Sequence, residues 1–156
     1  MATGFTKISS GIEDQLKGMV DRSRDMTSYL NRVVYQQYKN AQRQRWITEG
    51  SSEGPKWKAL NKGYAESKLT RFASYPGGGR HILIATGELQ KSVIGPGGGH
   101  RKIVTDHSIE INWTTDYADK VNDVRPFSAF GNKTNQEIYD GIAKFLISGL
   151  MRSFGK

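Results

Sequence analysis

The chain of 156 residues contains no cysteine, which excludes disulfide bonds and metal sites built on thiolates. It also lacks the apolar segment of a secretory signal after Met1, and no stretch approaches the roughly 20 apolar residues that a membrane-spanning helix needs. These absences predict a protein that is neither secreted nor embedded in a membrane. The length suffices for one well-buried core and is short for two, so we expect a single domain over residues 1–156.

Patterns for catalysis and ligand binding are missing as well. His81, His100 and His107 are dispersed and have no clustered carboxylates beside them, so no metal site is predicted. His107 follows Asp106, but adjacent residues of a strand point to opposite faces, which argues against a catalytic triad. The glycine-rich residues 95–102 lack the endings of nucleotide-binding loops. We therefore expect no enzymatic activity and no cofactor.

Positive charge is the strongest compositional signal. The net charge of +8, from 23 Lys and Arg against 15 Asp and Glu, favours a polyanion as partner. The basic residues form no dense block, however, which is also typical of an ordinary solvated surface. Both interpretations stay open for the basic residues of the N-terminal region, which are candidate DNA-facing positions: Arg22, Arg24, Arg32, Lys39, Arg43 and Arg45.

The N-terminal region has the pattern of one long amphipathic helix. Ser10 and Glu13 form a capping box, and apolar residues then recur at steps of three, four or seven from Ile12 to Trp46. About 35 residues at about 1.5 Å each span about 50 Å, whereas a domain of this size is about 40 Å across. The helix either kinks back, with residues 23–25 as a weak point, or buries part of its apolar stripe on another subunit.

The residues after this helix predict a loop and a short helix. Gly, Ser and Pro at residues 49–55 end the long helix, and Trp57 and Leu60 then bring the chain back onto the core. Asn61 is positioned to cap a helix that ends near residue 69, with its apolar residues facing inward and Lys68 outside.

Residues 83–94 are the centre of the sequence pattern. We predict a strand, a single turn capped by Thr86 and Gly87, and a second strand, with a structural rather than a catalytic role. Glycine-rich segments at residues 72–79 and 95–99 bracket this stretch. Runs of glycine are unfavourable inside strands, so we expect a hairpin or a loop between subunits there.

The last third predicts a hairpin, an edge strand and a helix. Residues 102–106 and 108–113 alternate as two paired strands do. Residues 125–127 favour an extended edge strand around a proline, where Arg125 either pairs with a carboxylate of a neighbouring chain or is solvated. Thr134 opens a second capping box, and an apolar stripe follows until the predicted end near Gly155.

These elements predict an α+β fold in three parts. Residues 1–47 form the long N-terminal helical region. Residues 48–133 form a core with short helices, glycine-rich loops and a small, mainly antiparallel sheet of about four strands. Residues 134–156 form a C-terminal helix that packs on the sheet.

Several short motifs also follow one another in a distinctive order. They are Trp46 with Glu49 and Gly50, Trp57 with Leu60, Lys68, Ile82 with Leu83, Thr86 with Gly87, Leu89 and Ser92, Tyr117 with Ala118, and Arg125 with Pro126 and Phe127. This ordered set, between about residues 46 and 130, resembles the virion-morphogenesis or tail-completion proteins of long-tailed bacteriophages. The chain departs from that pattern after Ala118, where Lys120, Val121 and Asn122 replace the family's frequent His and Gly.

The resemblance implies a structural virion protein of the neck, the junction between head and tail. It implies assembly in the host cytoplasm as a ring, expected to hold six copies, between the head connector or adaptor proteins and the tail tube or tail terminator proteins. Genomic DNA would pass through such a ring in transient contact with it. The alternatives are a tail terminator ring that caps the tail tube and, from another class, a non-specific DNA-binding protein.

Overall fold

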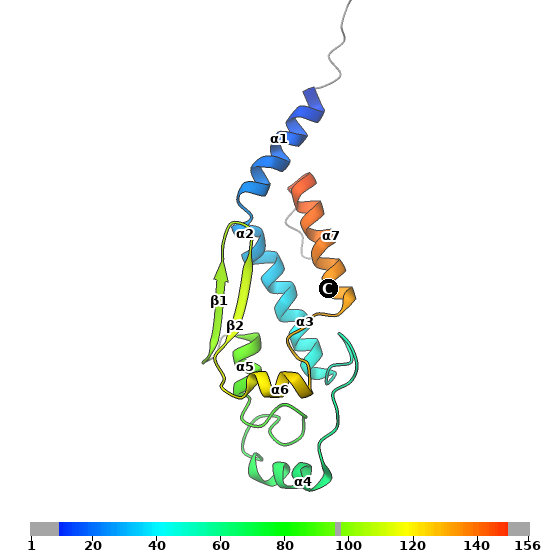
Figure 1. Cartoon of the computed structure of the whole chain (residues 1–156), viewed down its shortest axis with the longest axis vertical. Coiled ribbons are helices and arrows are strands. Elements are labelled where there is room, and N and C mark those ends of the chain that lie inside the picture. The colour runs from blue at the N-terminus through cyan, green and yellow to red at the C-terminus, as the bar shows by residue number, and fades with distance from the viewer. Residues whose placement is uncertain (1–9, 96–97, 150–156) are drawn as a thin grey trace, which may run out of the picture.

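The computed structural model describes residues 10–95 and 98–149 and has the predicted α+β class. Helices dominate it, with one antiparallel pair of strands (Figure 1). The elements are α1 (Ser10–Arg24), α2 (Thr27–Tyr29), the π-helical segment η1 (Leu30–Val34), α3 (Tyr35–Ile47), α4 (Lys62–Arg71), α5 (Glu88–Ile94), β1 (His100–Val104), β2 (Ile109–Trp113), α6 (Ala118–Val124) and α7 (Asn132–Ser148).

The long N-terminal helix is present from Ser10, the first described residue, but it divides between α1 and α2. Asp25 Oδ1 accepts a hydrogen bond from the backbone N–H of Thr27 at 2.9 Å, and the N–H of Met26 donates to the carbonyl of Asp106 at 2.8 Å. The side chain of Asp25 therefore starts a new helix at the weak point that the sequence indicated. Beyond the break, α2, η1 and α3 run on without interruption to Ile47, and we call them the rod.

Two apolar clusters lie along the rod. One surrounds Trp46, whose ring meets the edge of Trp57 with centroids 5.4 Å apart, and it includes Leu89 and Phe127. The other lies nearer the break and is centred on Tyr29, which stacks on Phe145 of α7 at 4.4 Å; its remaining buried members are Met26, Leu30, Val33 and Val34. The rod thus supplies one wall of both clusters.

The prediction of a strand, turn and strand at residues 83–94 is wrong. Gly87 adopts a left-handed conformation, with φ of 81°, and α5 follows it. Thr86 does take part in the entry, because its hydroxyl accepts the N–H of Glu88 at 3.3 Å. Leu89 and Val93 are buried together, four residues apart. That spacing suits a helix, so burial of this face outweighs the β propensity of the last residues.

The hairpin is present as predicted, but β1 (His100–Val104) begins and ends two residues before the predicted strand at 102–106, and β2 (Ile109–Trp113) begins one residue after the predicted start at 108. Strands β1 and β2 pair from His100 opposite Trp113 to Val104 opposite Ile109. Alternate residues of β2 are partly buried. Among the described residues these are the only strands, so the expected sheet of about four strands is wrong. Residues 125–127 join no sheet; the N–H of Phe127 instead donates to the side chain of Asn122 at 3.0 Å.

Helix α7 begins at Asn132, two residues before the predicted cap. Thr134 is therefore inside the helix and buried rather than capping it. Helix α7 packs mainly beside α1, and the hairpin and α7 flank the rod (Figure 1). The predicted stripe residues Ile138, Ile142, Phe145 and Leu146 belong to or pack against the cluster around Tyr29, and Val104 and Ile109 of the hairpin pack against the same cluster. Leu150, Met151 and the predicted end at Gly155 lie outside the described residues.

Replacing buried Trp57 or Leu89 with alanine should lower the free energy of unfolding by about 2–5 kcal/mol, because each change removes apolar contacts and leaves a cavity. Denaturant unfolding measures this loss. The matched control is Ile47→Ala, since Ile47 is 67% exposed and its truncation should change stability by less than about 0.5 kcal/mol. Trp57 and Leu89 variants with wild-type stability would contradict the assignment of these residues to the core.

Candidate functional site

Several of the motif residues converge on one groove, although they are far apart in the sequence. The groove has a volume of about 430 Å³ and lies between α4, the segment before α5, and α6. We call it the α4–α6 groove. The motif residues that line it are Leu60, Lys68, Ile82, Leu83, Thr86, Gly87, Leu89, Tyr117 and Arg125. Most residues of the ordered motif set therefore lie close together in the fold, around this groove.

Lys68 lies under the groove rather than on the surface, where the sequence placed it. Its side chain is buried, with 2% exposed, and Nζ donates to the carbonyl oxygens of His81 and, at 3.0 Å, Ile82. Gly79 makes this possible, because φ of 79° and the absence of a side chain let its backbone pass against α4. Burial lowers the pKa of Lys68, and the charge of Arg125 lowers it further, whereas Glu49 opposes the shift.

Helix α4 otherwise begins as predicted. Asn61 caps it, because its side-chain oxygen accepts the N–H of Gly63 at 3.0 Å. The inward face differs from the expected one, since Tyr64 and Leu69 are exposed and Lys68 is buried.

The segment around Arg125 is tied to the segment around Trp57. Arg125 Nε donates to the carbonyl of Lys58 at 2.9 Å, and Nη2 donates to that of Ala59 at 3.4 Å. In the opposite direction, Trp57 Nε1 donates to the carbonyl of Pro126 at 2.9 Å. Arg125 thus donates hydrogen bonds to backbone carbonyls of its own chain. The sequence analysis expected either a carboxylate of a neighbouring chain or solvent, and neither expectation describes this arrangement. Within the described residues, no carboxylate forms an ion pair with Arg125 or Lys68.

Ser92 connects α5 to the hairpin and to the segment after it. Its hydroxyl donates to the carbonyl of Leu89 at 2.8 Å and accepts the hydroxyl of Thr115 at 3.0 Å. Its carbonyl is 2.8 Å from Nδ1 of His100, whose Nε2 is 2.9 Å from the hydroxyl of Tyr35. Ser92 is fully buried, so these bonds satisfy polar groups that would otherwise be costly. Its role here is to join elements of the fold.

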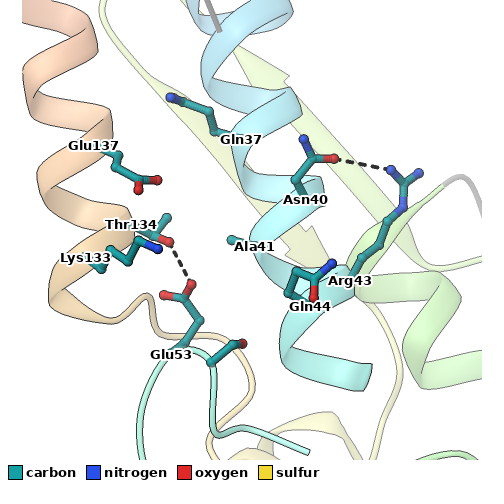
Figure 2. Close-up of a pocket in the computed structure, with 10 residues that line it drawn as sticks. Gln37, Asn40, Ala41, Arg43, Gln44, Glu53, Lys133, Thr134 and Glu137 are labelled. Carbon is teal, nitrogen blue, oxygen red and sulfur yellow. Dashed lines mark hydrogen bonds between the residues drawn. The ribbon is translucent and has the colours of Figure 1, made fainter. Parts of the chain in front are cut away.

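A second, polar cleft lies between α3 and α7, with a volume of about 520 Å³ (Figure 2). We call it the α3–α7 cleft. Its walls carry Gln37, Asn40, Ala41, Arg43 and Gln44 from α3, Ser52 and Glu53 from the following loop, and Lys133, Thr134 and Glu137 from α7. Both signs of charge are present. No sequence motif indicated this cleft, because its residues belong to three separate segments that only the tertiary fold brings together.

Glu53 is the residue that holds the start of α7. Its Oε2 accepts the N–H of Gly131 at 2.8 Å. Its Oε1 accepts the hydroxyl of Thr134 at 2.7 Å, and Figure 2 shows this second bond. A side chain at Gly131 would overlap the backbone of Glu53, so a glycine is required there. The carboxylate thus satisfies a free N–H at the helix start and places negative charge where the helix dipole favours it.

The six basic residues named as DNA-facing do not share one surface. Arg45 is buried, so it does not face outward, and burial lowers its pKa against the opposing charge of Glu53. Arg22 donates to the carbonyls of Leu146 and Ile147, at 2.8 and 3.0 Å, near the end of α7. Lys39 lies over the ring of Tyr35. The remaining residues are exposed and are Arg24, Arg32 and Arg43.

Neither the groove nor the cleft assembles the groups of a metal centre. Across residues 10–95 and 98–149, no three His, Asp or Glu side chains are close enough to share a metal ion. In the same part of the chain, no helix is both long and apolar enough to cross a membrane. What the two sites offer is an apolar groove with cations beneath it and a cleft of mixed polarity, which are features of surfaces that bind other molecules.

Comparison with known proteins adds no relative: no family model, no curated protein and no solved structure matches the chain.

Glu53→Ala should lower the free energy of unfolding by about 1–3 kcal/mol, because it leaves the Gly131 N–H and the Thr134 hydroxyl without their charged acceptor. Hydrogen exchange should rise first in the opening turn of α7, and denaturant unfolding gives the total loss. Glu137→Ala, in the same cleft, is the control and should change stability by less than about 0.5 kcal/mol. Equal stability of the two variants would exclude the proposed role of Glu53.

Proposed function

We propose that this chain is a structural protein of the virion neck, a ring-forming tail-completion protein that links the head connector to the tail of a long-tailed bacteriophage. The main support is the apolar face of α1, which no other described residue covers. Ile12, Leu16 and Val20 recur at steps of four and are 59%, 55% and 48% exposed. An amphipathic helix that presents such a stripe is expected to cover it with another protein.

The placement of α1 strengthens this expectation. The helix extends beyond the rod, with its outer end away from both apolar clusters (Figure 1). Dividing the long helix at residue 25 shortens it but leaves the stripe of α1 uncovered by the rest of the described chain. Of the two alternatives for the over-long helix, burial on another subunit is therefore the one that the proposal adopts.

The motif residues provide the second support. The phage family is suggested by an order of short motifs, and most of those motif residues line the α4–α6 groove, beside the hydrogen bonds that join the segments of Trp57 and Arg125. Residues that act together in space form a more specific signature than the same residues scattered over a surface. The ring of six copies and the head and tail proteins as partners follow from the family resemblance alone.

The distribution of basic residues favours a neck protein over a free DNA-binding protein. Sequence-specific binders place several side chains of one element against base edges. Here one of the six candidate residues is buried, another holds backbone carbonyls, and the exposed ones are spread along two helices and η1. We expect weak, salt-sensitive contact with passing DNA. A tail terminator ring would share all these features and differs from the first proposal only in its position.

Purified phage particles should contain this protein, and a reconstruction of the neck should place it as a ring between head connector and tail. Mass spectrometry of the particles tests the first point. Particles assembled with Leu16→Ser should contain several-fold less of the protein, whereas Gln15→Ser on the same helix should behave as wild type. Absence of the wild-type protein from finished particles, together with salt-resistant binding to one DNA sequence, would refute the neck proposal. Density at the tail end alone would select the terminator instead.

A further inference from the structure

One face of the rod is positively charged along its length. Arg32, Lys39 and Arg43 recur at steps of seven and four, which is the spacing of one helix face. The exposed residues between them are the neutral Gln36 and Asn40, and the rod itself contains no Asp or Glu. Arg32 and Arg43 are eleven residues apart, so at about 1.5 Å per residue this charged face is about 16 Å long.

Strand β1 adds a fourth cation beside this face. Lys102 Nζ lies 4.2 Å from the centroid of the Tyr35 ring, and Lys39 Nζ lies 4.9 Å from the same centroid. Lys102 also donates to Oδ1 of Asn31 in the rod. An aromatic ring attracts a cation without neutralising it, so both side chains are positioned and keep their charge. We call the four cations the basic face: Arg32, Lys39, Arg43 and Lys102.

Carboxylates bound the basic face but do not neutralise it. Among the residues that the structure describes, none of its four cations forms an ion pair. At the start of the rod lie Asp25 and Asp106, and both accept hydrogen bonds from the first residue of α2. At the other end, Figure 2 shows Arg43 pointing away from Glu137 of α7, and Arg43 Nη1 donates to Asn40 at 3.4 Å. The positive charge of the face is therefore available to a partner.

The chemistry of the basic face fits a phosphate backbone better than a protein surface. Protein interfaces place apolar residues at their centre, whereas every exposed residue of the rod from Asn31 to Gln44 is polar. Cations with amides between them are the groups that contact the phosphate and sugar oxygens of DNA. Duplex DNA carries one negative charge per about 1.7 Å of its axis, so a face of about 16 Å meets several phosphates at once. The π-helical segment η1, which carries Arg32, is a rare conformation that occurs often at functional sites.

We propose that the basic face binds the phosphate backbone of duplex DNA without reading its sequence. Three of its cations were DNA-facing candidates from the sequence alone, and Lys102 was not. This DNA contact deepens the proposed function and rests on it for the source of the DNA, which is the genome passing through the neck. In a ring of copies the rod then lines the channel, and the apolar stripe of α1 is left for a protein partner.

Fluorescence anisotropy of labelled duplexes of unrelated sequence, titrated with the full chain over a salt series, tests the DNA contact. The wild type should bind every duplex equally, and log Kd should rise with log salt at a slope of about 3 to 4, because each of the four cations neutralises one phosphate. Arg32→Ala combined with Arg43→Ala should lower this slope by about 2 and weaken binding by about tenfold or more at about 0.1 M salt. Lys62→Ala combined with Lys120→Ala is the matched control, because it removes the same charge from exposed positions on α4 and α6; it should bind as wild type.

Three results would overturn the basic face. Equal loss of binding in the two double variants, both folded by circular dichroism, would mean that net charge alone attracts the DNA. A wild-type preference for one duplex would show that the sequence is read. Polyglutamate that competes as well as unlabelled DNA would assign the face to an acidic protein instead.

Mass spectrometry of phage particles separates the DNA contact from the neck proposal. If the wild type binds no duplex but is present in particles, the DNA contact is wrong and the neck proposal stands. If the wild type binds duplexes through the basic face but is missing from particles, the neck proposal is wrong and the basic face stands.

Discussion

Trp57 joins three distant segments of the chain through one buried side chain. Its ring meets the edge of Trp46 at the end of the rod, and its Nε1 donates to the carbonyl of Pro126. The loop between the two tryptophans must pass tightly over this ring: Gly50 has φ of 97°, and a Cβ there would lie 2.8 Å from Cδ1 of Trp57. Trp57 thus joins the rod, the loop and the segment around Arg125, and the contact of Trp46 with Phe127 adds a second link between the rod and that segment.

Elements whose signals are local could be predicted from the sequence. Asn61 caps α4 through its own side chain, and the hairpin shows in the alternation of Ile109, Ile111 and Trp113. The break near Asp25 was indicated for the same reason, since a short polar side chain competes locally with the helix backbone. In each case the residues that decide the conformation are neighbours in the sequence, so the pattern contains the necessary information.

Features that depend on distant segments could not be predicted in this way. The burial of Lys68 depends on carbonyls that Gly79 brings against α4, and the position of Thr134 depends on Glu53, 81 residues away. The rod also buries Gln37, Gln42 and Arg45 beside its apolar stripe, because α3 is covered by both α5 and α7. A helix enclosed on several sides buries residues that its own periodicity assigns to solvent. The convergence of the groove residues has the same origin, although the order of their motifs had suggested a common role.

Because the helix is broken between α1 and α2, a small rotation at the break displaces the far end of α1 by a larger distance. The 15 residues of α1 at about 1.5 Å each give an arm of about 22 Å, so a rotation of about 10° at residue 25 moves the outer end by about 4 Å. Hydrogen bonds from Met26 to Asp106 and from Arg22 to the last turn of α7 lie close to the pivot and resist that rotation. A small change in the packing of α7 or of the hairpin turn would therefore displace the apolar stripe of α1 further than it displaces the residues near the break.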